Sequence, residues 1–236
     1  MTAQPYSPNE NLTINTLRIG THKILVIDNF LKQPQLMVEY ATQSQFSLYP
    51  GYANKKGYPG IRAAAPSDYS YDLTVLLEPI IKKEFSVPEN LDIRKSVCVY
   101  SLMTMRPQDL GPLQRTPHFD ASTPHHIAVL LYLCDEQHGG TAFYRHTTTG
   151  LDQITEDTRE NYLDIYYEEI NSKRPKPGYA KESSELYEKI GMVTAKFNRL
   201  VIYKGSMLHA PYIDTAVSID QNPKTGRLTV NTFYDF

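Results

Sequence analysis

The chain has 236 residues, of which 41% are hydrophobic and 21% are charged, and its formal net charge is −2. This length and apolar content are sufficient for one domain with a full hydrophobic core. The nearly neutral charge does not favour nucleic acid or an anionic membrane as a partner, and no apolar run approaches the ~20 residues of a membrane span.

The cysteines and the N-terminal sequence bear on the cellular compartment. Cys98 and Cys134 are the only cysteines, which is too few for a disulfide framework. The polar segment 1–11 lacks the apolar run of a signal peptide. We therefore expect a soluble protein of the reducing cytoplasm.

Patterns in the first third of the chain predict one strand and two helices. Residues 1–21 show no clear period and are expected to form a loosely held arm. The apolar run 23–28 predicts a strand, and residues 34–45 follow it with helix-start residues and helical spacing. Residues 71–85 again have helical spacing, with a kink expected at Pro79.

The segment between these helices, residues 47–71, has the composition of a loop. It is rich in tyrosine, glycine and proline, and it carries the basic residues Lys55, Lys56 and Arg62. Long aromatic loops in compact domains are often functional. We interpret this segment as a flap on the substrate side of a site, in which Arg62 either meets a substrate carboxylate or faces solvent.

The second half of the chain is predicted to be mainly β. A charged, helical segment at 145–190 interrupts the β pattern, and its proline and glycine breaks indicate an insertion rather than a second domain. The fold is therefore predicted to be α+β with a β-barrel or jelly-roll core, in a single domain 1–236. The apolar runs that predict strands are residues 96–103, 125–133, 140–144, 192–197, 200–203 and 228–234.

A metal-binding pattern occurs at residues 116–120, Thr-Pro-His-Phe-Asp. On an extended chain His118 and Asp120 lie on the same face and Phe119 on the other, because successive side chains alternate. An imidazole and a carboxylate suit a divalent first-row metal, and a second imidazole would complete the facial triad of non-haem Fe(II) oxygenases. Taken alone, however, such a pair is more often two polar neighbours on a surface strand.

The later strands supply candidates for the missing groups. His209 follows a tight turn at residues 203–205 and is the candidate third ligand. Arg227 and Thr229 share one face of the last strand, where the guanidinium offers a rigid fork for a carboxylate. Residues 125 and 126 are adjacent histidines, and only one of them can face a cavity from a strand. His146 is expected either to contact substrate or to lie on the surface.

The ordered set of these motifs resembles the 2-oxoglutarate and Fe(II)-dependent dioxygenases, especially the prolyl-hydroxylase-like branch. The set comprises His118-x-Asp120, then residues 139–143 (Gly-Gly-Thr-Ala-Phe), then His209, then Arg227-x-Thr229. Residues 26–31 (Val-Ile-Asp-Asn-Phe-Leu) are also similar to the strand-to-helix start of that branch. The resemblance covers residues 96–236 well and leaves the 145–190 insertion without a counterpart.

The resemblance implies a double-stranded β-helix, or jelly roll, in which His118, Asp120 and His209 are the catalytic metal ligands. It implies Fe(II) as the metal, with 2-oxoglutarate and O2 as co-substrates. The implied reaction hydroxylates a C–H bond and releases succinate and CO2, because Asp120 stands where halogenating relatives carry a small residue.

The resemblance also implies a binding site for the co-substrate. Arg227, with Thr229, would hold the distal carboxylate of 2-oxoglutarate, whereas Arg199 fits that role less well. Tyr132 or Tyr100 would donate a hydrogen bond to the same molecule from a core strand.

The charged, tyrosine-rich flap favours a polar substrate, either a small molecule such as an amino acid or a peptide. A homodimer is left open by the sequence.

Two other classes of protein fit parts of the pattern. A cupin-like metal protein without 2-oxoglutarate turnover would keep the three ligands and have no need of Arg227, whereas the ligands of a scaffold domain with a degenerate site would not converge.

Overall fold

The computed structural model describes residues 6–49, 57–213 and 219–236. Its helices within these ranges are α1 (Pro34–Gln43), α2 (Ser67–Phe85) and α3 (Glu156–Lys173). Its strands are β1 (Ile14–Ile19), β2 (His22–Ile27), β3 (Ser47–Leu48), β4 (Gly60–Ala64), β5 (Lys95–Met103), β6 (His126–Tyr132), β7 (Gly140–His146), β8 (Tyr187–Thr194), β9 (Arg199–Lys204), β10 (His209–Tyr212) and β11 (Leu228–Asp235).

The strands form two antiparallel sheets. The larger has the order β1-β2-β9-β6-β11-β5-β4-β3, and the smaller has the order β10-β7-β8. The predicted combination of helices with a β core is therefore confirmed, and the observed sheets are antiparallel. Among the described residues, no helix combines the length and the apolarity needed to cross a membrane.

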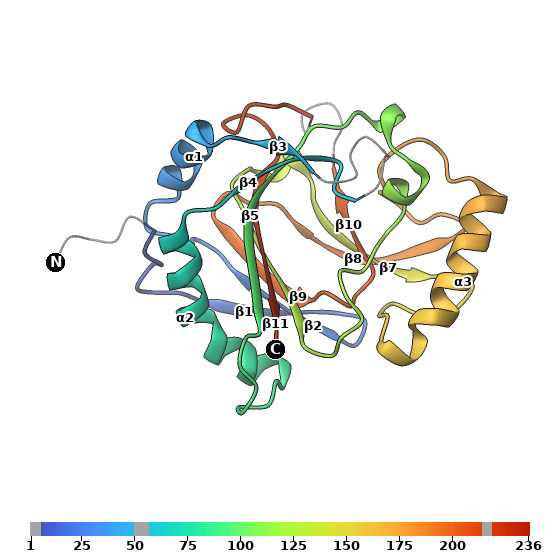
Figure 1. Cartoon of the computed structure of the whole chain (residues 1–236), viewed down its shortest axis with the longest axis horizontal. Helices are drawn as coiled ribbons and strands as arrows, with labels where there is room; N and C mark the ends of the chain where they lie inside the picture. The colour runs from blue at the N-terminus through green and yellow to red at the C-terminus, as the bar shows by residue number, and fades with distance from the viewer. Residues whose placement is uncertain (1–5, 50–56, 214–218) are drawn as a thin grey trace.

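The elements are stacked in four layers (Figure 1). Helices α1 and α2 cover one face of the larger sheet and bury its apolar side chains there. The opposite face packs against the smaller sheet, since one apolar cluster contains residues of β2, β6 and β9 together with β7 and β8. Helix α3 covers the outer face of the smaller sheet. The space between the two sheets is therefore the place for a site that is enclosed by strands.

Two predictions for the N-terminal part are wrong. The expected arm 1–21 contains β1, which pairs with β2 across the turn at Gly20, where φ is +59°. The side chains of β1 are mostly exposed, as on an edge strand, and the sequence of this strand therefore lacks an apolar pattern. The expected loop 47–71 contains β3, β4 and the beginning of α2, because strand pairing overrides its proline and glycine content. Residues 50–56 of that loop lie outside the described residues.

The other predicted elements overlap the observed ones, and α2 continues through Pro79. The helix expected within the 145–190 insertion is α3, which packs on the smaller sheet through Tyr162, Tyr166 and Ile170. The Tyr166 hydroxyl lies 2.9 Å from the hydroxyl oxygen of Thr116, at the start of the metal-binding pattern. The insertion is thus part of the surroundings of the predicted site.

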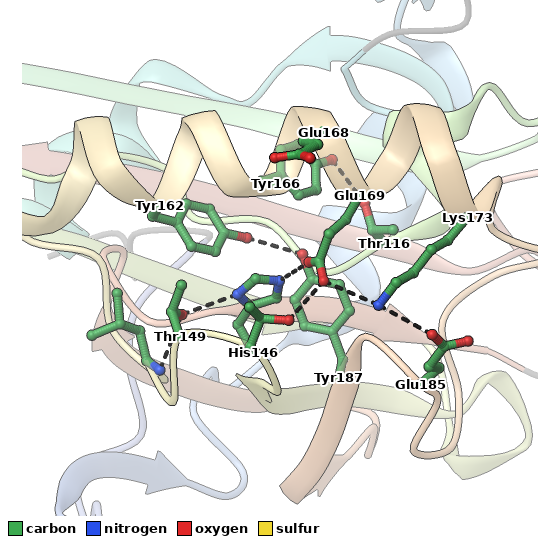
Figure 2. Close-up of polar contacts among 12 residues, drawn as sticks. Thr116, His146, Thr149, Tyr162, Tyr166, Glu168, Glu169, Lys173, Glu185 and Tyr187 are labelled. Atoms are coloured by element: carbon green, nitrogen blue, oxygen red, sulfur yellow. Dashed lines mark hydrogen bonds and ion pairs between the residues drawn. The ribbon is translucent and has the colours of Figure 1, made fainter.

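A buried hydrogen bond between His146 and Glu169 anchors α3 to β7 (Figure 2). The His146 side chain is enclosed, with Nε2 2.7 Å from Glu169 Oε2 and Nδ1 3.0 Å from the Thr149 hydroxyl oxygen. The Thr148 hydroxyl and Lys173 Nζ donate to the other carboxylate oxygen of Glu169, at 2.6 and 3.1 Å. His146 therefore has neither of its expected roles, because α3 covers it.

These contacts set the charge state of Glu169. Burial alone would raise the pKa of this carboxyl, but the hydrogen bonds from Thr148, Lys173 and His146 outweigh that effect and lower the pKa below its ordinary value of 4.5. A lowered pKa in the folded state means that the ionised carboxylate stabilises the fold above pH 4.5. That contribution is lost as the pH falls through the folded value.

We predict that Glu169→Gln lowers the free energy of unfolding by about 1–3 kcal/mol near neutral pH, because it weakens one buried and two partly buried hydrogen bonds. The difference from the wild type should shrink as the pH falls below 4.5, where the wild-type carboxylate becomes protonated. Urea unfolding at a series of pH values measures both effects. Glu168→Gln, at the exposed neighbouring position, is the control. Equal stability of the two variants at neutral pH would contradict the anchoring role.

Candidate metal centre

Backbone hydrogen bonds hold the metal-binding pattern against the beginning of β10. The His118 amide donates to the His209 carbonyl and the His209 amide donates to the His118 carbonyl, both at 2.8 Å. The Asp120 amide donates to the Gly205 carbonyl at 2.7 Å. The segment is thus extended as expected, although it forms a single bridge rather than a strand. Two distant parts of the chain are thereby fixed side by side.

The turn before β10 requires a glycine. A Cβ atom on Gly205 would lie 2.4 Å from Cδ2 of His126 and 3.2 Å from both Cβ and Oδ2 of Asp120. Such distances leave no room for a side chain, because His126 is held by its contact with Asp235 and Asp120 by its backbone hydrogen bond to Gly205 itself. The close approach of this turn brings Asp120 beside His209.

The three predicted ligands converge. Nε2 of His209 lies 3.6 Å from Oδ2 of Asp120, and Nε2 of His118 lies 3.8 Å from Oδ1. The ligand atoms all lie within 4.8 Å of one another. Two donors that are each about 2.1 Å from one ion are at most about 4.2 Å apart, and both imidazole–carboxylate distances meet this limit. The arrangement therefore fits a divalent metal ion.

The carboxylate of Asp120 needs such an ion. Its Oδ2 atom is buried and accepts no hydrogen bond from the described residues, because both imidazoles are too distant. An unpaired, buried carboxylate oxygen is unfavourable by about 1–3 kcal/mol or more. A cation bound between the three side chains would remove this cost.

The hydrogen bond made by His209 fixes its tautomer, and burial sets the charge of His118. His209 Nδ1 lies 2.8 Å from the Met207 carbonyl oxygen, which can only accept, and so Nδ1 carries the proton and Nε2 is free to bind a metal. The His118 ring stands inside the cavity described below, with 52% of its side chain facing that space. Desolvation there, followed by the proximity of His209, lowers the pKa of His118 to about 4. The imidazole is therefore neutral near pH 7.

A cavity of about 630 Å³ opens onto these ligands. Strands of both sheets line it, and Tyr166 and Tyr167 of α3 form part of its wall. Tyr49 and Tyr58, from the segment that was interpreted as a flap, also line it. A volume of this size suits a small-molecule ligand.

Arg227 brings a buried positive charge to the same cavity. Its side chain is 3% exposed, and Nη2 donates to the Gly140 carbonyl oxygen at 2.8 Å. Its Nε atom is buried and makes no hydrogen bond to the described residues. Arginine ion pairs in the described part of the chain involve Arg106, Arg145 and Arg199, and none involves Arg227. This guanidinium is thus available for an external carboxylate.

Two neighbours of Arg227 have their hydroxyl groups engaged within the protein. The Thr229 hydroxyl donates to Oδ1 of Asn231 at 2.7 Å. The Tyr132 and Thr141 hydroxyl oxygens are 2.6 Å apart, and the Tyr132 ring centroid lies 5.8 Å from the guanidinium carbon. Burial raises the pKa of Tyr132 to about 12, and it keeps its proton. Of this pair, Thr141 lines the cavity.

Tyr100 and Arg199 lie elsewhere. Tyr100 points to the opposite face of the larger sheet, where its hydroxyl donates to the Met37 carbonyl oxygen of α1 at 2.8 Å. We therefore do not place Tyr100 in the site. Nε of Arg199 lies 2.6 Å from Oδ1 of Asp28, and this contact lowers the pKa of Asp28 to about 2. Of the two candidate arginines, Arg227 is the one that lines the cavity.

Sequence reasoning missed several residues of the cavity. Tyr203 is buried, with its ring centroid 5.0 Å from that of His209, and the turn that follows it was the only signal. Tyr166 lies on α3, where the helical pattern of the sequence cannot reveal which surface the residue covers. Of the two adjacent histidines, His126 faces the cavity, as alternation requires, and its Nδ1 lies 2.7 Å from Oδ1 of Asp235.

Comparison with known sequences identifies a family. A model of the Family of unknown function (DUF6445) matches residues 9–234. The chain belongs to this family. No curated protein matches the DUF6445 chain.

Several solved structures are similar to the DUF6445 chain at low identity. HygX from Streptomyces hygroscopicus, solved with nickel, 2-oxoglutarate and hygromycin B bound, has 13% identity and a TM-score of 0.47, over 91% of this chain and 82% of its own. SnoK, a non-heme alpha ketoglutarate dependent carbocyclase from nogalamycin biosynthesis, has 11% identity and a TM-score of 0.45, over 90% of this chain and 79% of its own.

An N-substituted L-amino acid dioxygenase from Burkholderia ambifaria AMMD has 12% identity and a TM-score of 0.42, over 94% of this chain and 93% of its own. Likenesses at these values carry no assignment of function. The functional argument therefore rests on the geometry of the site itself.

We predict that His209→Ala and Asp120→Ala each weaken the binding of Ni(II), used as a stable substitute for Fe(II), by more than about 100-fold. Loss of outer contacts to a metal ligand already costs about 10–100-fold, and loss of a ligand costs more. Calorimetric titration measures the affinity. His125→Ala, which removes a histidine outside the cavity, should leave it unchanged. Unaltered binding by the His209 variant would overturn the metal centre.

Proposed function

We propose that this protein is a non-haem Fe(II) and 2-oxoglutarate-dependent oxygenase that hydroxylates a C–H bond of a polar small molecule or peptide, with release of succinate and CO2. One observation carries the proposal. His118, Asp120 and His209 converge, and a buried carboxylate oxygen of Asp120 lacks a partner. The buried guanidinium of Arg227 lines the same cavity and has no acidic partner in the described residues.

Different side chains would bind the metal and the co-substrate. His118, Asp120 and His209 would hold Fe(II) through two imidazoles and one carboxylate. Arg227 would bind the distal carboxylate of 2-oxoglutarate through its unpaired donor. When bound, this metal and co-substrate supply the oxidising power for hydroxylation with O2.

The surroundings support this division. The site lies between two antiparallel sheets that pack face to face, which agrees with the jelly-roll fold that the sequence implied. Tyr203 and the Tyr132–Thr141 pair would keep the co-substrate pocket enclosed and exclude bulk water. Membership of the prolyl-hydroxylase-like branch, the single domain 1–236 and the cytoplasmic location stay predictions.

We predict that Arg227→Gln raises the Kd for 2-oxoglutarate by at least about 30-fold without loss of Ni(II) binding. Removal of one partner of a buried charge pair costs about 2–5 kcal/mol. Calorimetric titration of the Ni(II)-loaded protein with 2-oxoglutarate measures the effect. Arg199→Gln removes the rival arginine, and it should lower stability but leave 2-oxoglutarate binding intact. A larger loss in the Arg199 variant would reverse the assignment.

We also predict that the Fe(II)-loaded protein converts 2-oxoglutarate to succinate in air, slowly without substrate and faster with it, and that His209→Ala abolishes this turnover. Succinate is quantified by mass spectrometry. Metal binding without any succinate formation would instead support the cupin-like metal protein, in which His118, Asp120 and His209 serve a different reaction.

A further inference from the structure

A second arginine, Arg62, faces the cavity from β4, the strand next to the edge of the larger sheet. Arg62 of β4 pairs directly with Ser101 of β5, Ser101 pairs with Thr229 of β11, and Thr229 pairs with Tyr132 of β6. Directly opposed residues of antiparallel strands point to the same face. Arg62 therefore belongs to one polar row that crosses the inner face of the sheet, and it lines the cavity.

Two tyrosine rings hold the Arg62 side chain in place. Its guanidinium carbon lies 4.6 Å from the ring centroid of Tyr49 and 4.7 Å from that of Tyr58. The two rings are 6.5 Å apart and inclined at 71°. Seen from the guanidinium carbon, these distances place the two rings at about a right angle, so cation–π contacts hold the guanidinium from two adjacent directions. This arrangement is rigid enough to select a ligand.

Arg62, Tyr49 and Tyr58 form a clamp in which two buried polar atoms have no hydrogen-bond partner among the described residues. The Nε atom of Arg62 and the hydroxyl oxygen of Tyr58 are both buried and make no hydrogen bond. Arg62 also takes part in none of the arginine ion pairs of the described chain. Burial raises the pKa of Tyr58 to about 12, against the opposing effect of Arg227 and Arg62. Tyr58 thus keeps its proton, and it lies near both guanidinium groups as a hydrogen-bond donor.

The charge balance of the cavity leaves one positive charge unmatched. A ferrous ion with Asp120 would carry a net charge of plus one, and Arg227 and Arg62 would add one each. The two carboxylates of 2-oxoglutarate cancel two of these three charges. Lys95 and Asp235, which also line the cavity, cancel each other. One anionic group beyond the co-substrate is therefore needed to neutralise the site.

From these observations we infer that the substrate is an acid, and that the guanidinium of Arg62 and the hydroxyl of Tyr58 bind its carboxylate. This inference rests on the proposed function, because it assigns the distal carboxylate of 2-oxoglutarate to Arg227. It narrows the substrate class to molecules with a free carboxylate, such as amino acids, their N-substituted derivatives and peptides with an accessible C-terminus. Arg62 is then a determinant of specificity rather than a part of the metal centre.

The test compares acids with their uncharged counterparts. The Ni(II)- and 2-oxoglutarate-loaded protein is titrated with N-acetylated amino acids of apolar, aromatic, polar and acidic side chains, and with the corresponding C-terminal amides. Binding is followed by calorimetry and by thermal stability. We expect at least one acid to bind at least about tenfold more tightly than its amide, since a charge-assisted, bidentate contact is lost in the amide.

Variants assign that preference to the clamp. Arg62→Gln should remove the preference for the acid while leaving the Kd for 2-oxoglutarate within about twofold of the wild type. Tyr58→Phe, which keeps the ring and loses only the hydroxyl, should weaken acid binding without unfolding. Arg159→Gln changes the net charge equally at an exposed position of α3 and should have no effect.

The inference is overturned if no acid binds, if acids and amides bind equally, or if Arg62→Gln weakens 2-oxoglutarate binding instead. The last result would assign the Arg62 charge to the co-substrate. Failure of the proposed function is distinguishable, because it would appear as absent 2-oxoglutarate binding in the wild type. The preference for acids over amides would then still be measurable on the Ni(II)-loaded protein alone.

Discussion

The candidate site depends on one short piece of backbone pairing, the two hydrogen bonds between His118 and His209. These bonds join the segment that carries Asp120 to the beginning of β10, and they bring the two imidazoles to the same side of the carboxylate. Gly205 allows the joining turn to approach within a distance that no side chain would permit. The metal-binding geometry is therefore set by main-chain contacts.

Buried charges without protein partners account for the rest of the site. Asp120 offers a carboxylate oxygen, and Arg227 offers a guanidinium nitrogen, that no described residue satisfies. Folding tolerates such groups only when other interactions outweigh their desolvation, and a bound ligand that pairs them recovers that loss. An unpaired anion and an unpaired cation on one cavity favour a metal ion together with an acidic co-substrate. Arg62 extends the same reasoning to an acidic substrate.

The segment between β7 and β8 lines the cavity on one side. Helix α3 contributes Tyr166 and Tyr167 to the wall, and the Tyr166 hydroxyl contacts Thr116 beside the metal ligands. The buried His146–Glu169 pair fixes this helix to β7 (Figure 2). A substrate would therefore meet a wall that is held by buried hydrogen bonds rather than by surface contacts, and the shape of the cavity is coupled to the stability of α3.

The sequence by itself determined the local features of this protein. Residue alternation placed His118 and Asp120 on one face, and most strands followed from apolar runs. Tertiary structure decided which distant residues meet. Tyr100 and Tyr132 look equivalent in sequence, yet strand pairing turns the first towards α1 and the second towards Arg227. The position of Arg62 beside the cavity likewise depends on its register with β5. The local sequence determines which face of a strand a side chain occupies, whereas its neighbours across the sheet belong to strands that are far away in the chain.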